Sequence, residues 1–174
     1  MNQQAPFWRV ENAGLILAAP FIPRLLEVTD VLDLDGVGPK PAEIGRAARL
    51  LQFLVDGQGG APAEQLHLNR LLCGVPPDAP EPPADAPDEP TEAEREACLG
   101  LLNSLIGHWG VLGSSRIDAL RESFLRRPGR LDFSPDGWIL SVERSALDVL
   151  VDQLPWSLSP IWFDWMPEPI VVEW

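Results

Sequence analysis

The sequence predicts an α+β fold, with a compact set of amphipathic helices and a small antiparallel sheet formed by the C-terminal third. Between residues 41 and 127, apolar residues recur at helical spacing in several stretches, as in helices that bury one face. After residue 129 the pattern alternates on both sides of an SPDG turn, which is typical of a β-hairpin. We expect residues 1–174 to form a single domain.

Composition places the chain among globular proteins. With 174 residues and 45% hydrophobic content, it is long enough to bury about 70% of its unfolded surface. No apolar run reaches the ~18–20 residues that cross a bilayer, and the first residues lack the basic and apolar regions of a signal peptide. Two cysteines, Cys73 and Cys98, are too few for a disulfide framework and are typical of a reducing compartment. We therefore expect a cytoplasmic protein with no membrane partner.

The net charge of −13, with Lys40 as the single lysine, bears on the kind of partner. Nucleic-acid binding requires a basic face that neutralises phosphates, so we expect no nucleic-acid partner. An acidic surface favours solubility or a basic protein partner. When isolated, the chain is expected to be a monomer or small oligomer.

The N-terminal region offers two interpretations. Residues 7–17 suit a buried strand, although Asn12 equally suits the cap of a short helix. A short helix is expected after Pro20, because proline is tolerated in a first turn. The following DLDGVG loop starts like a calcium loop, but position twelve counted from Asp33 is Ile44 rather than glutamate, so we expect no calcium site.

Two amphipathic helices are expected next. The first covers residues 41–55 and ends at Gly57, and the second covers 63–73 and ends at Gly74. Residues 75–90 then interleave prolines with acidic residues. This composition predicts a disordered acidic, proline-rich insertion on the surface.

A capping box, TEAE, opens the clearest helix at Thr91. Its expected apolar stripe runs through Leu99, Leu102, Leu105, Ile106 and Trp109. A further helix is expected over residues 116–127, capped by Ser115. Basic residues gather near its end and are a candidate basic patch: Arg126, Arg127 and Arg130. They either complement the helix dipole or bind an acidic partner.

The last third supplies the predicted sheet. LDFS and WILSVE form the hairpin around SPDG, and PIVVEW is the candidate third strand, because two strands alone are marginal. Between them, residues 145–154 are expected to form a short helix capped by Ser145.

The C-terminal stretch LPWSLSPIWFDWMPEPIVVEW holds four of the seven tryptophans and four prolines. Proline fixes φ and removes a backbone donor, so we expect an extended segment that wraps the rest of the domain. Large aromatic side chains here form either a lid over the core or a docking surface. The candidate protein-binding residues are Trp162, Phe163, Trp165 and Met166.

No motif of a known enzyme class is recognisable, such as GxSxG, HExxH, paired CxxC, a P-loop or GxGxxG. His67 and His108 each stand without a second ligand at metal-binding spacing. We expect no catalytic residues, no metal and no cofactor, and we rank an enzyme of unknown class last among the functions considered.

Several stretches together resemble the conserved C-terminal region of the tape measure proteins of contractile injection systems, which are phage-tail-like particles. The resemblance is carried, in this order, by NAG with its apolar run, LLCGVP, HW, LRESFL, LPW and a terminal VEW. It extends over nearly the whole chain from Trp8 to Trp174.

The resemblance implies a structural assembly protein that engages the inner tube or the baseplate hub. Its partners would be protein components of a tail tube, hub or baseplate, met in the cytoplasm during assembly and retained in a released or membrane-anchored particle. An α-helix rises only ~1.5 Å per residue, so we do not extend the tube-measuring role to this chain. It is either a docking module, as the terminal domain of a longer protein or as a short homologue, or a small adaptor or assembly chaperone.

Overall fold

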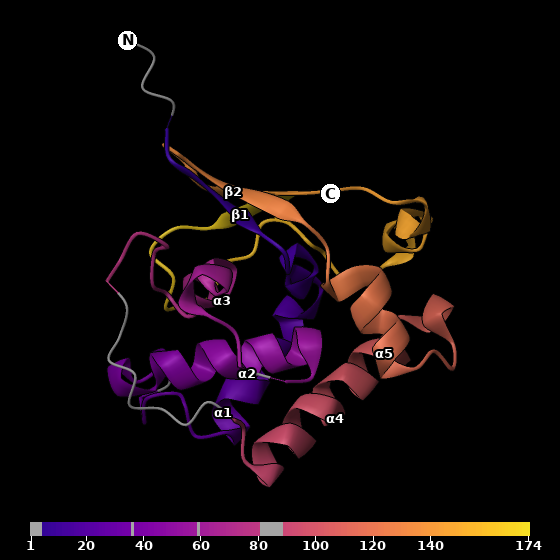
Figure 1. Ribbon diagram of the computed structural model, residues 1–174, viewed down its shortest axis with the longest axis horizontal. Coiled ribbons are helices and arrows are strands. Elements are labelled where there is room, and N and C mark those ends of the chain that lie inside the picture. The colour runs from indigo at the N-terminus through magenta and orange to yellow at the C-terminus, as the bar shows by residue number, and fades with distance from the viewer. Residues whose placement is uncertain (1–4, 36, 59, 81–88) are drawn as a thin grey trace.

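The computed structural model describes residues 5–35, 37–58, 60–80 and 89–174. A four-stranded sheet lies along one side of a helical body (Figure 1), which confirms the α+β prediction. The strands are β1 (Phe7–Val10), β2 (Gly129–Ser134), β3 (Gly137–Val142) and β4 (Ile170–Glu173). The α-helices are α1 (Ile22–Val28), α2 (Ile44–Asp56), α3 (His67–Leu72), α4 (Glu92–His108) and α5 (Ile117–Leu120).

The sheet has the order β1-β2-β3-β4 and is mixed. The β2–β3 hairpin is present around the SPDG turn, with Ser134 opposite Gly137. The C-terminal strand β4 joins it as predicted but runs parallel to β3, so the expectation of a purely antiparallel sheet is wrong. Residues 143–169 separate these strands, and a connection of that length permits a crossover to a parallel neighbour.

The N-terminal region contains both structures considered for it. β1 covers only Phe7–Val10 and extends the sheet beside β2. The chain then forms a 3₁₀ helix, η1 (Ala13–Phe21). Asn12 occupies the position before this helix, but its side chain caps no backbone N–H of η1.

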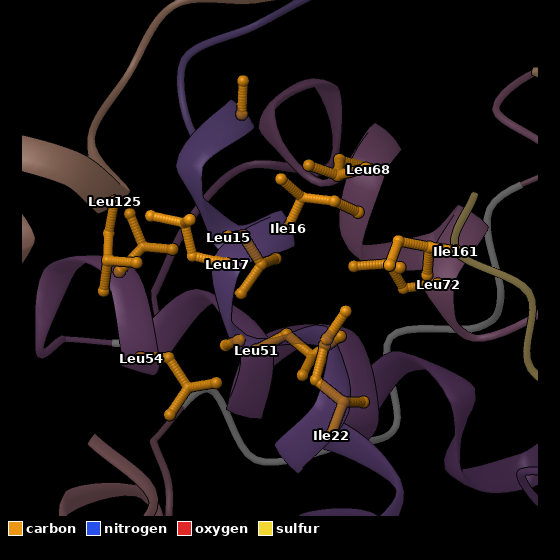
Figure 2. Close-up of a cluster of buried hydrophobic side chains, with 14 of the residues drawn as sticks. Leu15, Ile16, Leu17, Ile22, Leu51, Leu54, Leu68, Leu72, Leu125 and Ile161 are labelled. Atoms are coloured by element: carbon orange, nitrogen blue, oxygen red, sulfur yellow. The ribbon is translucent and has the colours of Figure 1, made fainter. Parts of the chain in front are cut away.

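η1 is the centre of the hydrophobic core. Leu15, Ile16 and Leu17 are completely buried, and Figure 2 shows them surrounded by side chains from α2, α3 and the C-terminal segment. A 3₁₀ helix places side chains on three sides, which suits a segment that is apolar all round. Leu51, Leu68 and Ile161 belong to the same cluster.

Backbone and amide contacts fix η1 at its N-terminal end. The Ala13 N–H donates to the Arg127 carbonyl at 2.8 Å. The buried Asn12 amide donates to Gln52 Oε1 at 3.0 Å and to Asn69 Oδ1 at 2.6 Å, which ties η1 to α2 and α3. A buried amide without partners costs about 1–3 kcal/mol, so these bonds favour one position of η1.

The predicted helix ends are correct in part. The helices expected from residues 41 and 63 begin later, at Ile44 and His67, after 3₁₀ turns over Pro41–Glu43 and Ala63–Gln65. α2 ends at Gly57 with φ of 74°, and the Thr91–Glu94 capping box opens α4. The Ser115 cap is wrong, because the Ser115 hydroxyl bonds the Leu112 carbonyl and Arg116 precedes α5 without a side-chain cap. α5 continues as a π-helical turn, η5 (Arg121–Leu125).

Other short turns complete the chain: η2 (Pro41–Glu43), η3 (Ala63–Gln65), η4 (Gly110–Leu112), η6 (Ala146–Val149) and η7 (Val151–Gln153). The helix expected over residues 145–154 is therefore a pair of 3₁₀ turns, and its Ser145–Asp148 capping box is present. On α4 the expected stripe is wrong at Leu99, which is exposed, while Cys98 and Leu101 face the core.

The expected acidic insertion begins on the body of the protein. Arg70 of α3 donates to the Ala79 and Pro80 carbonyls at 3.0 and 2.9 Å, and Pro77 is buried. Residues 81–88, where most of the predicted disorder falls, lie outside the described residues.

Gly14 permits the closest approach in the core. A Cβ at this position would lie 1.7 Å from the Phe124 carbonyl oxygen, and neither backbone can move without disturbing the packed core. We expect Gly14→Ala to destabilise the protein by about 3 kcal/mol or more, the upper range for overpacking. Urea unfolding of the two proteins measures the loss.

The matched control is Gly100→Ala on α4, where an added Cβ meets nothing within 4 Å. Alanine should stabilise this helix by about 0.5–1 kcal/mol. Equal effects of the two substitutions would contradict the central position assigned to Gly14.

Candidate protein-binding site

The segment 154–169 contains no helix, as predicted from its prolines, and crosses the domain through bends and a turn at residues 164–165 rather than as an extended chain. Its indole N–H groups hold it in place by bonding backbone carbonyls. Trp156 donates to Leu17 of η1 at 3.2 Å, and Trp165 donates to Leu72 of α3 at 2.9 Å. Each indole therefore satisfies its polar atom while its ring packs against the core.

Trp165 and Met166 face the body of the protein. Met166 is buried, with 4% of its surface exposed. Trp165 lies against two glycines: an added Cβ would be 2.6 Å from the Trp165 Cβ at Gly38 and 2.7 Å from the Trp165 carbonyl oxygen at Gly74. These side chains form the lid that the composition of the stretch suggested.

Trp162 faces outward. It is 62% exposed, although its indole N–H donates to the Met166 carbonyl at 2.9 Å. Phe163 is half-buried, and its ring packs on Trp165 with centroids 5.0 Å apart. Of the four candidate residues, only Trp162 is thus mostly exposed, and the adjacent turn is held against the domain by Trp165 and Met166.

The three arginines of the candidate basic patch do not form one cationic surface. Arg127 is buried, Arg126 donates to the Asp56 carbonyl at 3.3 Å, and Arg130 pairs with Asp132 at 2.6 Å. The guanidinium of Arg130 also lies 4.0 Å from the centre of the Phe7 ring. Each arginine is occupied by a separate part of the fold.

Arg127 is the most heavily used of the three. It bonds both carboxylate oxygens of Asp148, at 2.8 and 3.0 Å, and the two side chains are almost completely buried. It also donates to the Ser123 carbonyl at 2.7 Å and to the Glu143 carbonyl at 2.9 Å. Its guanidinium lies 5.4 Å from the centre of the Trp174 ring. One side chain therefore joins η5, the end of β3, the η6 turn and the C-terminus.

Asp148 is held in its charged form. Burial by itself would raise its pKa, but hydrogen bonds from the Ser145 backbone and from Arg127 outweigh burial and lower the pKa below its usual range. The buried Trp174 indole N–H makes no hydrogen bond of good geometry, yet it is close enough to the carboxylate to favour the charged form.

Burial keeps both cysteine thiols protonated. Burial raises the pKa of the Cys73 and Cys98 thiols to about 12, so neither forms a nucleophilic thiolate at neutral pH. His108 bonds the Ser104 carbonyl in its own helix at 2.7 Å. Within the described ranges, no group of three or more His, Cys, Asp or Glu side chains is placed to hold a metal ion.

The comparison with protein families decides the identity of the chain. The family model for the contractile injection system tape measure protein matches residues 2–174. The chain belongs to this family. No curated protein and no solved structure matches it.

The stretches that resemble this tape measure family are the ones that build the core. NAG supplies Gly14 and its contact with Phe124. HW supplies Trp109, which is fully buried and donates to the Leu150 carbonyl at 3.0 Å. LPW supplies Trp156, bonded to η1. Among the described helices of this tape measure protein, none is long and apolar enough to cross a membrane.

Sequence reasoning missed two features of the tape measure domain. The first is the Arg127–Asp148 pair, because the sequence pattern predicts a helix-end or basic-patch role for Arg127 and gives no sign of a partner 21 residues further on. The second is an aromatic corner of Trp8, Phe133 and Trp138, whose rings adjoin across β1, β2 and β3. Its sequence signal is the presence of aromatic residues on the inner face of each of these strands.

We expect Asp148→Asn to destabilise the protein by about 3–5 kcal/mol at pH 7, because it leaves the buried Arg127 charge uncompensated. The pKa of Asp148 is lowered in the folded state, so its contribution is present above an unfolded pKa of about 3.9 and is lost as pH falls through the folded value. The difference in unfolding free energy between wild type and variant should therefore shrink below about pH 4.

Glu27→Gln is the matched control, since Glu27 pairs with Arg24 at 2.8 Å on an exposed helix surface. Such pairs contribute less than about 1 kcal/mol. Urea unfolding from pH 3 to pH 7 compares the three proteins, and a constant gap across this range would contradict the role given to the Asp148 charge.

Proposed function

We propose that this domain is a docking module that attaches a tape-measure-type protein to the inner tube or the baseplate hub of a contractile injection system. The contractile injection system is inferred from membership of the family. Trp162 is inferred to be the contact residue, because an exposed large aromatic side chain held on a rigid base is a favoured anchor of protein interfaces.

The geometry around Trp162 supports this proposal. The side chain keeps 62% of its surface exposed, while the next residues are fixed by Met166 in the core and by the Trp165 bond to Leu72. An anchor that is rigid before binding loses little conformational entropy on association. The indole N–H is already bonded to Met166, so the ring is offered as an apolar surface.

Docking occurs during particle assembly in the cytoplasm, and the domain stays in the finished particle. The acidic net charge of −13 favours a basic surface on the partner and faster encounter at low ionic strength. Detection of the chain in purified particles by mass spectrometry supports docking. Its absence from particles that need it for assembly would instead indicate the adaptor or chaperone function.

The sharpest test is Trp162→Ala. We expect the melting temperature to change by a few degrees at most, because the side chain is exposed, and affinity for the tube or hub protein to fall about tenfold or more. Pull-down and calorimetry with the tube, hub and baseplate proteins of the same particle measure the effect. Trp162→Phe should retain most of the binding, since it keeps an aromatic surface.

Val149→Ala is the matched control, because Val149 is 63% exposed on η6 and should not affect binding. Unfolding of the Trp162→Ala variant would show that Trp162 belongs to the lid. Unchanged binding by a folded variant would move the docking site elsewhere.

A further inference from the structure

A cavity of about 350 Å³ opens beside the inner face of the sheet. It lies between the start of β1, the tip of the β2–β3 hairpin and the end of α3, and Pro167 and Glu168 close one side. These two residues directly follow Met166, so the cavity adjoins the segment that carries Trp162. Cavities of this size accommodate small ligands or single side chains.

Aromatic rings form the walls. Trp138 lies between Trp8 and Phe133, with ring centroids 5.6 and 4.8 Å away and both pairs inclined rather than parallel. All three occupy the sheet face that carries the buried Leu131 and Leu140, as their strand register requires. Phe133 is nevertheless 45% exposed, because the space beside it is unfilled by the described residues.

Two carboxylates stand at this aromatic corner. Asp78 and Glu168 both line the cavity. Neither forms an ion pair with any residue that the structure describes. Arg70, the α3 cation whose guanidinium reaches the backbone next to Asp78, donates instead to the Ala79 and Pro80 carbonyls. The site thus combines aromatic rings with two carboxylates that form no ion pair with the described residues.

We propose that this cavity binds a cationic side chain, lysine or arginine, from the protein on which the domain docks. Aromatic faces attract cations through the ring quadrupole, and nearby carboxylates add to that attraction. The net charge of −13 over the whole chain draws a basic partner toward it. This inference rests on the proposed docking function and names the chemistry of the partner.

The test begins with small probes. The tripeptides Ac-Gly-Arg-Gly-NH₂ and Ac-Gly-Lys-Gly-NH₂ are titrated into the protein, with Ac-Gly-Met-Gly-NH₂ as the neutral apolar comparison. The readout is the NMR shift of the Trp8 and Trp138 indole N–H resonances, and Trp156, bonded to η1, is the internal reference. We expect saturable shifts with the cationic tripeptides that weaken as salt rises.

Variants then separate charge from shape. Asp78→Asn and Glu168→Gln keep side-chain size and remove charge, and Phe133→Leu removes an aromatic face. Each should weaken binding of the arginine tripeptide about threefold or more. Asp136→Asn, which neutralises an exposed carboxylate in the hairpin turn outside the cavity lining, should have no effect. Equal binding of the methionine tripeptide, or no shift with any tripeptide, would overturn the proposal.

Binding to the tail component distinguishes this inference from the proposed function. The double variant Asp78→Asn/Glu168→Gln is expected to lose at least about tenfold in affinity while its melting temperature stays unchanged. If Trp162→Ala abolishes binding and the double variant binds normally, docking stands and the cationic pocket is refuted. If both variants bind normally, the cationic pocket is refuted and the docking site lies elsewhere on the domain. If the wild-type domain binds no tube, hub or baseplate protein, the docking function itself fails.

Discussion

The fold depends on burying one short apolar segment, η1, on every side. A segment without a polar face cannot lie on the surface, so α2, α3, α4 and the C-terminal segment must enclose it. Gly14 allows η5 to approach η1 closely, because its missing side chain leaves room for the Phe124 carbonyl. The hydrogen bonds from the Asn12 amide to Gln52 and Asn69 fix the position of η1 along its own axis. Enclosure on all sides explains why the family resemblance is spread over distant stretches rather than one motif.

Arginine side chains link the segments around η1 by hydrogen bonds to backbone carbonyls. Arginine side chains in many of the described segments donate to backbone carbonyls: Arg46, Arg70, Arg95, Arg121, Arg126 and Arg127. Arg121 shows the principle, since its guanidinium bonds the Leu54 and Phe53 carbonyls at the end of α2. A planar guanidinium offers several donors in fixed directions, which an ammonium does not, and a cation suits a helix C-terminus. This use explains why Arg126 and Arg127 do not form a basic surface together with Arg130.

The tryptophans differ in what their indole N–H groups and rings contact. The indole N–H donates to a carbonyl of another segment in Trp109, Trp156 and Trp165. These side chains therefore join distant parts of the chain. Trp162 bonds within its own turn and leaves its ring exposed. The aromatic corner of Trp8, Phe133 and Trp138 is a third use, in which rings line a cavity beside two carboxylates that form no ion pair with the described residues. Trp162 and this cavity adjoin at residues 166–168, which supports treating them as parts of one docking surface.

Local sequence patterns predict the α+β class, the end of α2 near Gly57, the start of α4 at its capping box, the hairpin and the family, because periodicity, capping residues and turn chemistry act over a few neighbouring positions. It also located the wrapping C-terminal segment, since proline acts on its own backbone. Only the tertiary structure decided the parallel pairing of β4, the addition of β1 to the sheet and the fate of each candidate side chain. Trp162 and Met166 are four residues apart, yet one is exposed and the other buried. Arg127 meets Asp148 only because separate segments fold together. Such outcomes depend on contacts between residues distant in the chain, which no local pattern encodes.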